Sequence, residues 1–208
     1  MFRKMSVAII KYNAGNIRSV LFALERIGVE GIVTDDKQQI RKSEKVIFPG
    51  VGEAGSAMAY LRERNLDKVI KDLNQPVLGI CLGMQLLCHH SEENNTTCLG
   101  IIPVNVKKFQ VITPSQVPGG NNTLKVPQIG WNNLYDLKSP LFSEIEENSY
   151  VYNVHSFYAE DSQYTIAKCN YGIDYAAAVS RDNFYGLQFH TEKSAAVGEQ
   201  ILKNFLRL

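Results

Sequence analysis

Apolar and polar positions follow two different periods along the chain, and the change comes near residue 100. In the first half, short apolar runs predict four strands, at 6–12, 31–34, 45–48 and 76–80. Between them, apolar residues recur at helical spacing and predict three helices, at 17–27, 54–66 and 82–90. Short apolar strands joined by helices indicate parallel βαβ units in a doubly wound α/β sheet, whose ligands lie outside the carboxyl ends of the strands.

The second half has a different hydrophobic pattern, in which strand-like runs follow one another at hairpin spacing. They lie at 101–112, 124–129, 150–158, 164–169, 176–181 and 184–189. This pattern predicts an antiparallel sheet added to the parallel one, and a helix over 192–208 is expected to close the chain. No repeat or linker divides the sequence, so we expect one domain over 1–208.

Composition narrows the class of protein. With 45% hydrophobic and 21% charged residues, the chain has the composition of a folded globular protein. A net charge of +1 gives no basic field for nucleic acid, and no apolar run is long enough to cross a membrane. The four cysteines form no CxxC pair or disulfide framework, so we expect reduced thiols in the cytoplasm.

The sharpest chemical signal is GICLGMQ at 79–85, where an apolar strand turns abruptly into a helix around Cys81. Small flanking residues permit a strained turn that exposes a nucleophile, and a helix amino terminus favours a thiolate. A buried cysteine without chemical function is the alternative for this segment alone. Cys88, His89, His90 and Cys98 have no four-ligand spacing, so no metal is expected.

A partner for the thiol is found in GLQFHTE at 186–192. If the strand continues, His190 and Glu192 point to the same side, so that the carboxylate orients the imidazole as in a triad. A structural histidine is the alternative for this segment alone, but the two segments together favour a Cys81, His190 and Glu192 triad. No P-C-x-x-C partner supports His190 as a zinc ligand.

GICLGMQ and GLQFHTEKS resemble the class I, triad-type glutamine amidotransferases. Further motifs are similar to those of glutaminase subunits of imidazole glycerol phosphate synthases, namely YNAGN, FPGVG, KVPQIGWN and YVYNVHSFY. The resemblance implies a flavodoxin-like, mostly parallel central sheet flanked by helices, and free L-glutamine as substrate, with no cofactor. Two departures are Thr191, where the family usually has proline, and a polar Gly-Gly loop at 112–123 of unknown role.

The resemblance also implies a role for each motif. Cys81 attacks the glutamine amide carbon, His190 transfers protons and Glu192 orients the imidazole. Oxyanion donors come from Leu82 and the turn of Gly50, Val51 and Gly52. Substrate contacts are expected from Gln85, one helical turn after Cys81, and from Val154, Ser156 and Phe157.

A (β/α)8-barrel cyclase is the implied partner, as a heterodimer that receives the ammonia through an internal channel. Loop positions near the site suggest that Asn13, Asn16, Trp131 and Lys193 face it. Three alternatives remain open from the sequence. They are a glutaminase that feeds a different synthase, such as one for surface-sugar amination, a catalytically idle subunit that stabilises a partner, and a γ-glutamyl peptidase.

Overall fold

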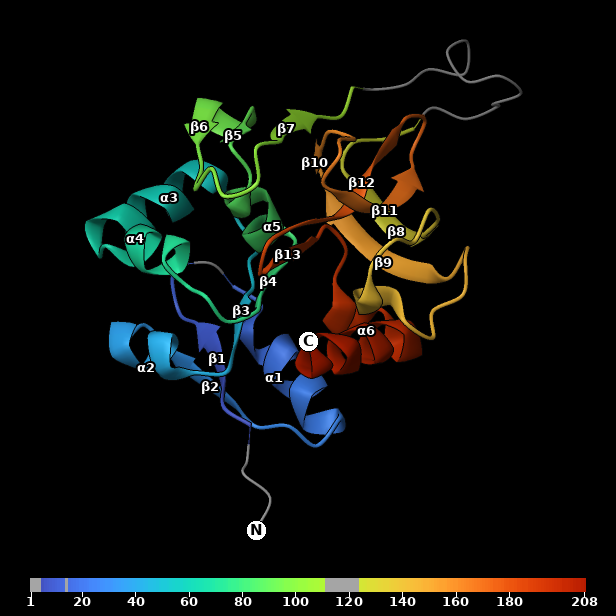
Figure 1. The fold of residues 1–208 in the computed structure, drawn as a ribbon. Coiled ribbons are helices and arrows are strands. Elements are labelled where there is room, and N and C mark those ends of the chain that lie inside the picture. Colours follow the sequence, from blue (N-terminus) through green and yellow to red (C-terminus); the bar gives the residue numbers. More distant parts are fainter. Residues whose placement is uncertain (1–4, 14, 111–123) are drawn as a thin grey trace.

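A computed structural model describes residues 5–13, 15–110 and 124–208. The expected loop at 112–123 therefore lies outside the described residues. The first half alternates strands and helices as predicted (Figure 1). Its elements are β1 (Val7–Ile10), α1 (Ile17–Arg26), β2 (Gly31–Thr34), α2 (Lys37–Lys42), β3 (Lys45–Phe48), α3 (Ala54–Glu63), α4 (Leu66–Lys71), β4 (Val77–Ile80) and α5 (Leu82–Leu87).

The second half is rich in strands, with short turns between them. Its elements are β5 (His90–Ser91), η1 (Glu93–Asn95), β6 (Thr96–Thr97), β7 (Asn105–Lys108), β8 (Gln128–Asn133), η3 (Pro140–Phe142), β9 (Tyr150–His155), β10 (Phe157–Ala159), β11 (Thr165–Asn170), β12 (Asp174–Arg181), β13 (Phe184–Leu187), η4 (Thr191–Lys193) and α6 (Ala195–Arg207). Among the described residues, no helix has the length and apolar character to cross a membrane.

Within the described residues, one mixed sheet of eleven strands forms the centre, in the order β2-β1-β3-β4-β13-β12-β10-β7-β5-β6, with β11 beside β12. The five strands from β2 to β13 are parallel, and β12 reverses the direction. The predicted parallel sheet with an antiparallel addition is confirmed in outline. The expectation that 184–189 belongs to the antiparallel part holds on one side only, because β13 lies antiparallel to β12 but parallel to β4 at the centre of the sheet.

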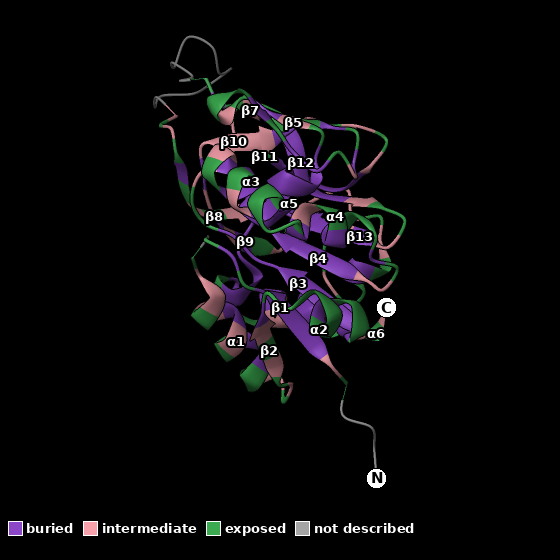
Figure 2. Cartoon of the chain, turned by 90° about the vertical axis from the view of Figure 1, so that its left-hand side faces the viewer, coloured by how far each residue is buried: buried purple, intermediate pink, exposed green. Residues whose placement is uncertain are grey.

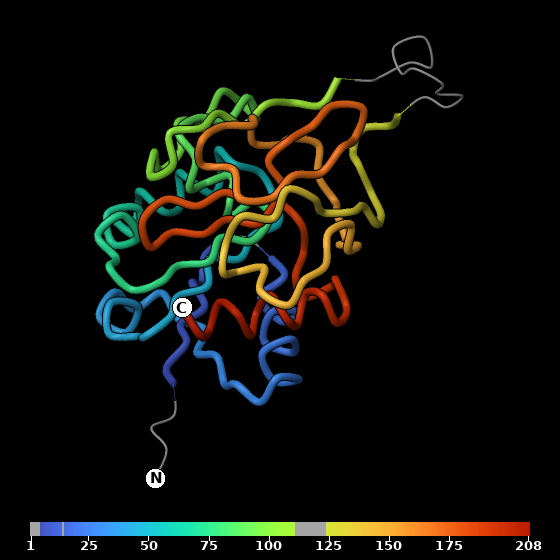
Figure 3. The backbone as a smooth tube through the Cα atoms, turned by 45° about the vertical axis from the view of Figure 1, so that its right-hand side comes forward, coloured from blue at the N-terminus to red at the C-terminus, as the bar shows by residue number. Residues whose placement is uncertain are grey.

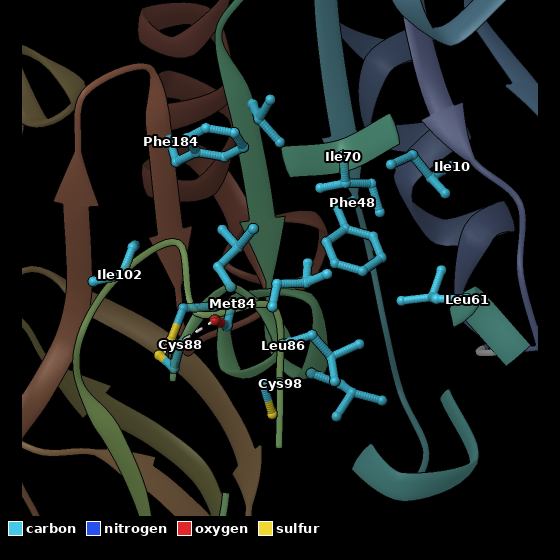
Figure 4. Packing of buried hydrophobic residues seen from close by; sticks show 14 of the residues in the cluster. Ile10, Phe48, Leu61, Ile70, Met84, Leu86, Cys88, Cys98, Ile102 and Phe184 are labelled. Carbon is cyan, nitrogen blue, oxygen red and sulfur yellow. Dashed lines mark hydrogen bonds between the residues drawn. The ribbon is translucent and has the colours of Figure 1, made fainter. Parts of the chain in front are cut away.

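Strands β1, β3 and β4 of the parallel sheet are buried along their length (Figure 2). The sheet separates two apolar layers, because successive side chains of each strand point to opposite faces. Ala8 and Ile10 of β1 pack on the side of α2 to α5, whereas Val7 and Ile9 pack on the side of α1 and α6. The first layer includes Phe48, Met84 and Phe184 (Figure 4). On the other side, the first and last helices lie side by side (Figure 3), and Arg26 of α1 pairs with Glu199 of α6 at 2.7 Å.

Several boundaries differ from the sequence predictions. The helix expected over 54–66 breaks at Asn65, whose φ of 54° is left-handed, and α4 follows as a separate helix. The helix expected over 82–90 ends at Leu87, and the strand expected at 124–129 is β8, which begins at Gln128. Helix α2 was not predicted, because only Ile40 of its six residues is buried and six residues carry little periodicity.

The run at 150–158 is divided at Ser156 into β9 and β10. Strand β9 pairs with β8 in a separate antiparallel sheet of two strands, and β10 enters the central sheet between β12 and β7. Ser156 is therefore the point where the chain leaves one sheet and joins the other.

Candidate functional site

Cys81 lies on a strained turn at the carboxyl end of β4. Its φ of 54° and ψ of −112° are unusual for a residue with a side chain. The Cys81 N–H donates to the Leu187 carbonyl at 2.7 Å, which fixes the turn to the end of β13. Gly83 allows close approach to the neighbouring strand, because a Cβ there would lie 1.8 Å from the Phe48 oxygen. Strand, strained residue and helix thus form the elbow predicted from GICLGMQ.

His190 and Glu192 come together although the reason given from the sequence is wrong. Strand β13 ends at Leu187, and Glu192 lies in the turn η4 instead of on a continued strand. Their side chains nevertheless meet, with His190 Nδ1 2.6 Å from Glu192 Oε1 and both side chains buried. Thr191, the departure from the family pattern, is the first residue of η4, and its buried Oγ1 has no hydrogen-bond partner.

Backbone contacts hold His190 on both sides. Its N–H donates to the Tyr152 carbonyl of β9 at 2.9 Å. Its carbonyl accepts from Ser194 Oγ at 2.7 Å, and Ser194 Oγ in turn accepts from the Tyr152 N–H at 3.0 Å. The imidazole is therefore fixed relative to β9 as well as to β13.

The charge state of His190 follows from its neighbours. Burial opposes the charged form, but hydrogen bonds and charge interactions with Cys81 and Glu192 outweigh it and raise the pKa of His190 to about 10. Because Glu192 occupies Nδ1, Nε2 is the nitrogen left to face the thiol. His190 is therefore an imidazolium beside Cys81 at neutral pH.

Asn16, expected at a partner interface, has its side chain against this pair. Its Nδ2 donates to Glu192 Oε1 and lies 3.4 Å from His190 Nδ1. Asn13, also expected at the interface, is exposed and donates to the Ser56 carbonyl at 3.2 Å. The YNAGN motif thus contributes to the site through Asn16, a contact that motif order alone does not reveal.

The expected oxyanion donors are close to Cys81 but are not all free. The Leu82 N–H donates to the Gly50 carbonyl at 3.2 Å. Tyr12 Oη donates to the preceding carbonyl, that of Pro49, at 2.6 Å. In this conformation the Gly50–Val51 peptide presents its oxygen, and not its N–H, to Leu82.

A cavity of about 330 Å³ opens beside Cys81. It is lined by residues from the predicted site, namely Val51, Gly52, Cys81, Leu82, Gln85, Val154, Ser156, Phe157, His190 and Lys193. It is also lined by His155, which lies between the predicted contacts Val154 and Ser156, and by Glu93 and Pro127, which were not predicted as site residues. Glu93 carries no motif that would identify it, because it reaches the cavity from the turn η1 after the chain has left α5.

Exposed apolar side chains lie next to this cavity on one face of the β8–β9 sheet. Ile129, Trp131 and Tyr150 are 64%, 53% and 61% exposed, and the strand register places them on the same face. Lys193 lies beside them, with Nζ 5.8 Å from the ring centre of Tyr152. We call Ile129, Trp131, Tyr150 and Tyr152 the β8–β9 outer face.

The described residues contain no group of three or more histidines, cysteines or carboxylates placed to bind a metal. Cys88 and Cys98, considered in the sequence, are buried in the apolar layer beside α5 (Figure 4).

Comparison with known proteins agrees with this geometry. A family model described as glutamine amidotransferase class-I matches residues 8–208. The chain is 52% identical to the imidazole glycerol phosphate synthase subunit HisH of Bacteroides fragilis, over 98% of this chain and 100% of that protein. It is 46% identical to the subunit of the same name from Shewanella oneidensis, over 99% of this chain and 97% of that protein.

Solved structures share the fold at much lower identity. A glutamine amidotransferase of known structure superposes with a TM-score of 0.71 at 16% identity, covering 97% of each chain. PurLQS from Thermotoga maritima gives 0.70 at 18% identity, covering 99% of each chain.

Proposed function

This chain belongs to the class-I glutamine amidotransferase family, and from that premise we propose that it is the glutaminase subunit of an imidazole glycerol phosphate synthase in histidine biosynthesis. It hydrolyses L-glutamine to glutamate and ammonia and passes the ammonia to a cyclase subunit. The observation that carries the proposal is the buried pair of His190 and Glu192 beside the strained Cys81. Its four cysteines are all unpaired, which favours the cytoplasm as its location.

The reaction begins at the thiolate. Cys81 Sγ forms a bond to the side-chain amide carbon of glutamine, and the carbonyl electrons move to the oxygen. When this intermediate collapses, the carbon–nitrogen bond breaks and His190 Nε2 gives its proton to the leaving nitrogen, which departs as ammonia. Neutral His190 then takes a proton from water, the hydroxide attacks the glutamyl thioester, and glutamate and the thiolate are released.

Recognition of the amino-acid end of glutamine requires a group for its positive charge. Glu93 lines the cavity with a carboxylate, and burial raises its pKa although it accepts from the Ala54 N–H at 2.7 Å. We propose that this carboxylate binds the α-ammonium group of glutamine, because an opposite charge stabilises a partly buried carboxylate. Val154, Ser156 and Phe157 supply backbone groups along the same wall.

Oxyanion stabilisation requires the Gly50–Val51 peptide to rotate. Rotation withdraws the Gly50 oxygen from the Leu82 N–H and turns the Val51 N–H inward, so that two donors face the oxyanion. Glycine at position 50 keeps the barrier low. Basal activity is therefore low, and the partner's bound nucleotide raises it by favouring the rotated turn.

The proposed partner is a (β/α)8-barrel cyclase bound as a heterodimer over the β8–β9 outer face. Exposed aromatic side chains of this kind are typical anchors of protein interfaces. The contacts that we propose are Trp131, Lys193, Asn13 and Asn16, of which Lys193 also lines the cavity where ammonia is released. A channel that begins here keeps the ammonia from water.

Glutamate release tests the proposal. The chain alone, the chain with the barrel cyclase, and the chain with the cyclase and its nucleotide are compared, with Cys81→Ala as the blank. We expect a low rate alone, a rise of at least tenfold with cyclase and nucleotide, and no rate in the blank.

Other outcomes identify the alternatives. A Cys81-dependent rate that ignores the cyclase indicates a glutaminase for another synthase, and no rate under any condition indicates an idle subunit. Cleavage of γ-glutamyl peptides without a partner indicates a peptidase.

A further inference from the structure

A buried glutamine that the mechanism above does not use lies beside the nucleophile. In the register of the two central strands, Leu187 of β13 is opposite Ile80 of β4. Gln188 directly follows β13 and Cys81 directly follows β4, so the two residues are neighbours at the carboxyl edge of the sheet. Gln188 is fully buried, and its Nε2 is 3.9 Å from Cys81 Sγ.

The direction of the Gln188 amide is fixed by a chain of contacts that starts at a backbone carbonyl. Gln85 Nε2 lies 3.0 Å from the Phe157 oxygen, which can only accept, so the NH₂ group of Gln85 must face it. The same NH₂ group lies 3.0 Å from Gln188, which must therefore present its oxygen to Gln85. The remaining end of Gln188, its NH₂ group, then faces sulfur.

We propose that Gln188 is a further catalytic residue, which donates an N–H to the Cys81 thiolate and holds Gln85 so that the Gln85 carbonyl oxygen is the group offered to the substrate. The first role adds a neutral donor to the charged His190 at the same sulfur. The second follows because both N–H donors of Gln85 are used by Phe157 and Gln188. The inference rests on the proposed function only where it names Cys81 as the nucleophile.

Burial increases the effect of such a donor. Sulfur and amide are both screened from water, so the N–H interacts with the thiolate in a medium of low polarity. Gln188 is also held in place by its own backbone, whose N–H donates to the Ala177 carbonyl of β12 at 2.9 Å. The amide therefore needs no reorganisation when the thiolate forms or attacks.

Alkylation of Cys81 tests the first role without glutamine or partner. The rate of inactivation by iodoacetamide is measured from pH 5 to 10 for wild type, Gln188→Met and Gln188→Glu, with Cys81→Ala as the blank. Gln188→Met removes the donor, and we expect a rate at pH 7 about tenfold lower and a profile displaced to higher pH, as for loss of a hydrogen bond to a charged group. Gln188→Glu replaces the donor by a carboxylate oxygen, and we expect a larger displacement.

The comparison keeps the other groups near sulfur constant. Every variant keeps the same ionisable groups near sulfur, namely His190 with its partner Glu192, Tyr12, and the cavity residues Glu93, His155 and Lys193. The matched control is Gln128→Met, which also removes a buried glutamine, here one that accepts from Tyr175 Oη at 3.1 Å and does not line the cavity. We expect it to alkylate as wild type does, although its melting temperature falls.

Steady-state glutaminase kinetics test the second role. Gln188→Met frees the Gln85 amide, so KM for glutamine rises several-fold and kcat falls. Gln188→Glu still offers an acceptor to Gln85, so KM stays within about twofold of wild type while kcat falls.

The proposal is overturned if Gln188→Met alkylates at the wild-type rate and pH profile while losing as much thermal stability as Gln128→Met. If Gln188→Glu does not fold, the alkylation rate and pH profile of Gln188→Met alone test the proposal. If the chain hydrolyses no glutamine, the proposed function fails, but the alkylation profiles still decide whether Gln188 acts on the thiolate.

Discussion

His155 is a histidine held neutral in the wall of the cavity. Its Nδ1 lies 2.8 Å from the Phe157 carbonyl, which can only accept, so the proton of the neutral ring is on Nδ1. Its Nε2 lies 3.3 Å from Tyr175 Oη. Phe109 packs on the ring at 5.3 Å. Burial lowers the pKa of His155 to about 4, against the hydrogen bond to Phe157 and with the help of charge on His190.

This shift predicts how stability depends on pH. As pH falls below 6.5, the unfolded chain takes up a proton at position 155 and the folded chain does not, so the contribution of His155 to stability is lost towards pH 4. Comparing pH 7 with pH 5, we expect the free energy of unfolding to fall by about 2 kcal/mol more in wild type than in His155→Gln. Urea titrations at the two pH values measure the difference, and equal losses in both proteins would contradict the assignment.

Among single residues, the sequence identified the candidate site residues that lie in local motifs. Cys81 is flanked by small residues in an elbow, and His190 and Glu192 lie two positions apart, so both signals are local. Glu93 and Gln188, for which we propose roles, are brought to the site by the fold, through a turn after α5 and through the pairing of β4 with β13. Gln188 even lies inside the GLQFHTE motif, yet only the strand register shows that it faces sulfur.

Among the elements, α6 positions the histidine through a close backbone contact. A Cβ at Gly198 would lie 1.9 Å from the Thr191 oxygen, so the helix approaches the turn η4 as closely as glycine allows. Ser194, at the start of the same helix, bridges the His190 carbonyl and the Tyr152 N–H. The last helix therefore determines where His190 and Glu192 lie.

We expect Gly198→Ala to impair catalysis more than its distance from the cavity suggests. The added methyl group must displace Thr191 or the helix, at a cost of about 1–3 kcal/mol in stability. A displaced imidazole lowers kcat ten- to a hundredfold, the order of effect for a misplaced catalytic group. Lys203→Ala on the exposed side of the same helix is the control, and equal kcat values for the two variants would show that α6 does not position His190.

Elements with a strong apolar pattern were predicted to within a few residues, and β2 and β3 to the residue. What the pattern could not reveal is the order of strands, since β13 is separated from β4 by about a hundred residues of chain but pairs with it. Nor could it show that Ser156 divides the run at 150–158, because both halves keep strand character.

For the whole molecule, the β8–β9 outer face is the surface on which we propose that the partner binds. Its Trp131 and Tyr150 side chains are exposed in a sheet that is separate from the central one, and Lys193, which lines the cavity, also lies near the Tyr152 ring. A partner bound here would contact both the catalytic turn η4 and the strand β9, which holds the His190 backbone.

We expect Trp131→Ala to weaken binding of the barrel cyclase by about thirtyfold or more, as loss of a buried aromatic anchor does. Lys193→Glu is expected to slow association and to reduce its dependence on salt. Titration calorimetry and stopped-flow mixing measure these effects. Lys71→Glu on α4 is the control, because that helix lies on the other side of the molecule (Figure 1), and wild-type affinity in both face variants would place the partner elsewhere.

The position of β13 also has a consequence for protein synthesis. During translation, β4 leaves the ribosome long before its neighbour in the sheet exists, and its free edge stays unpaired until Leu187 has emerged. A nascent chain stalled earlier therefore carries the nucleophile on an open, apolar sheet edge that is prone to aggregation. Because the strand that closes that edge leads directly into the histidine, the chain becomes active only when the sheet is complete.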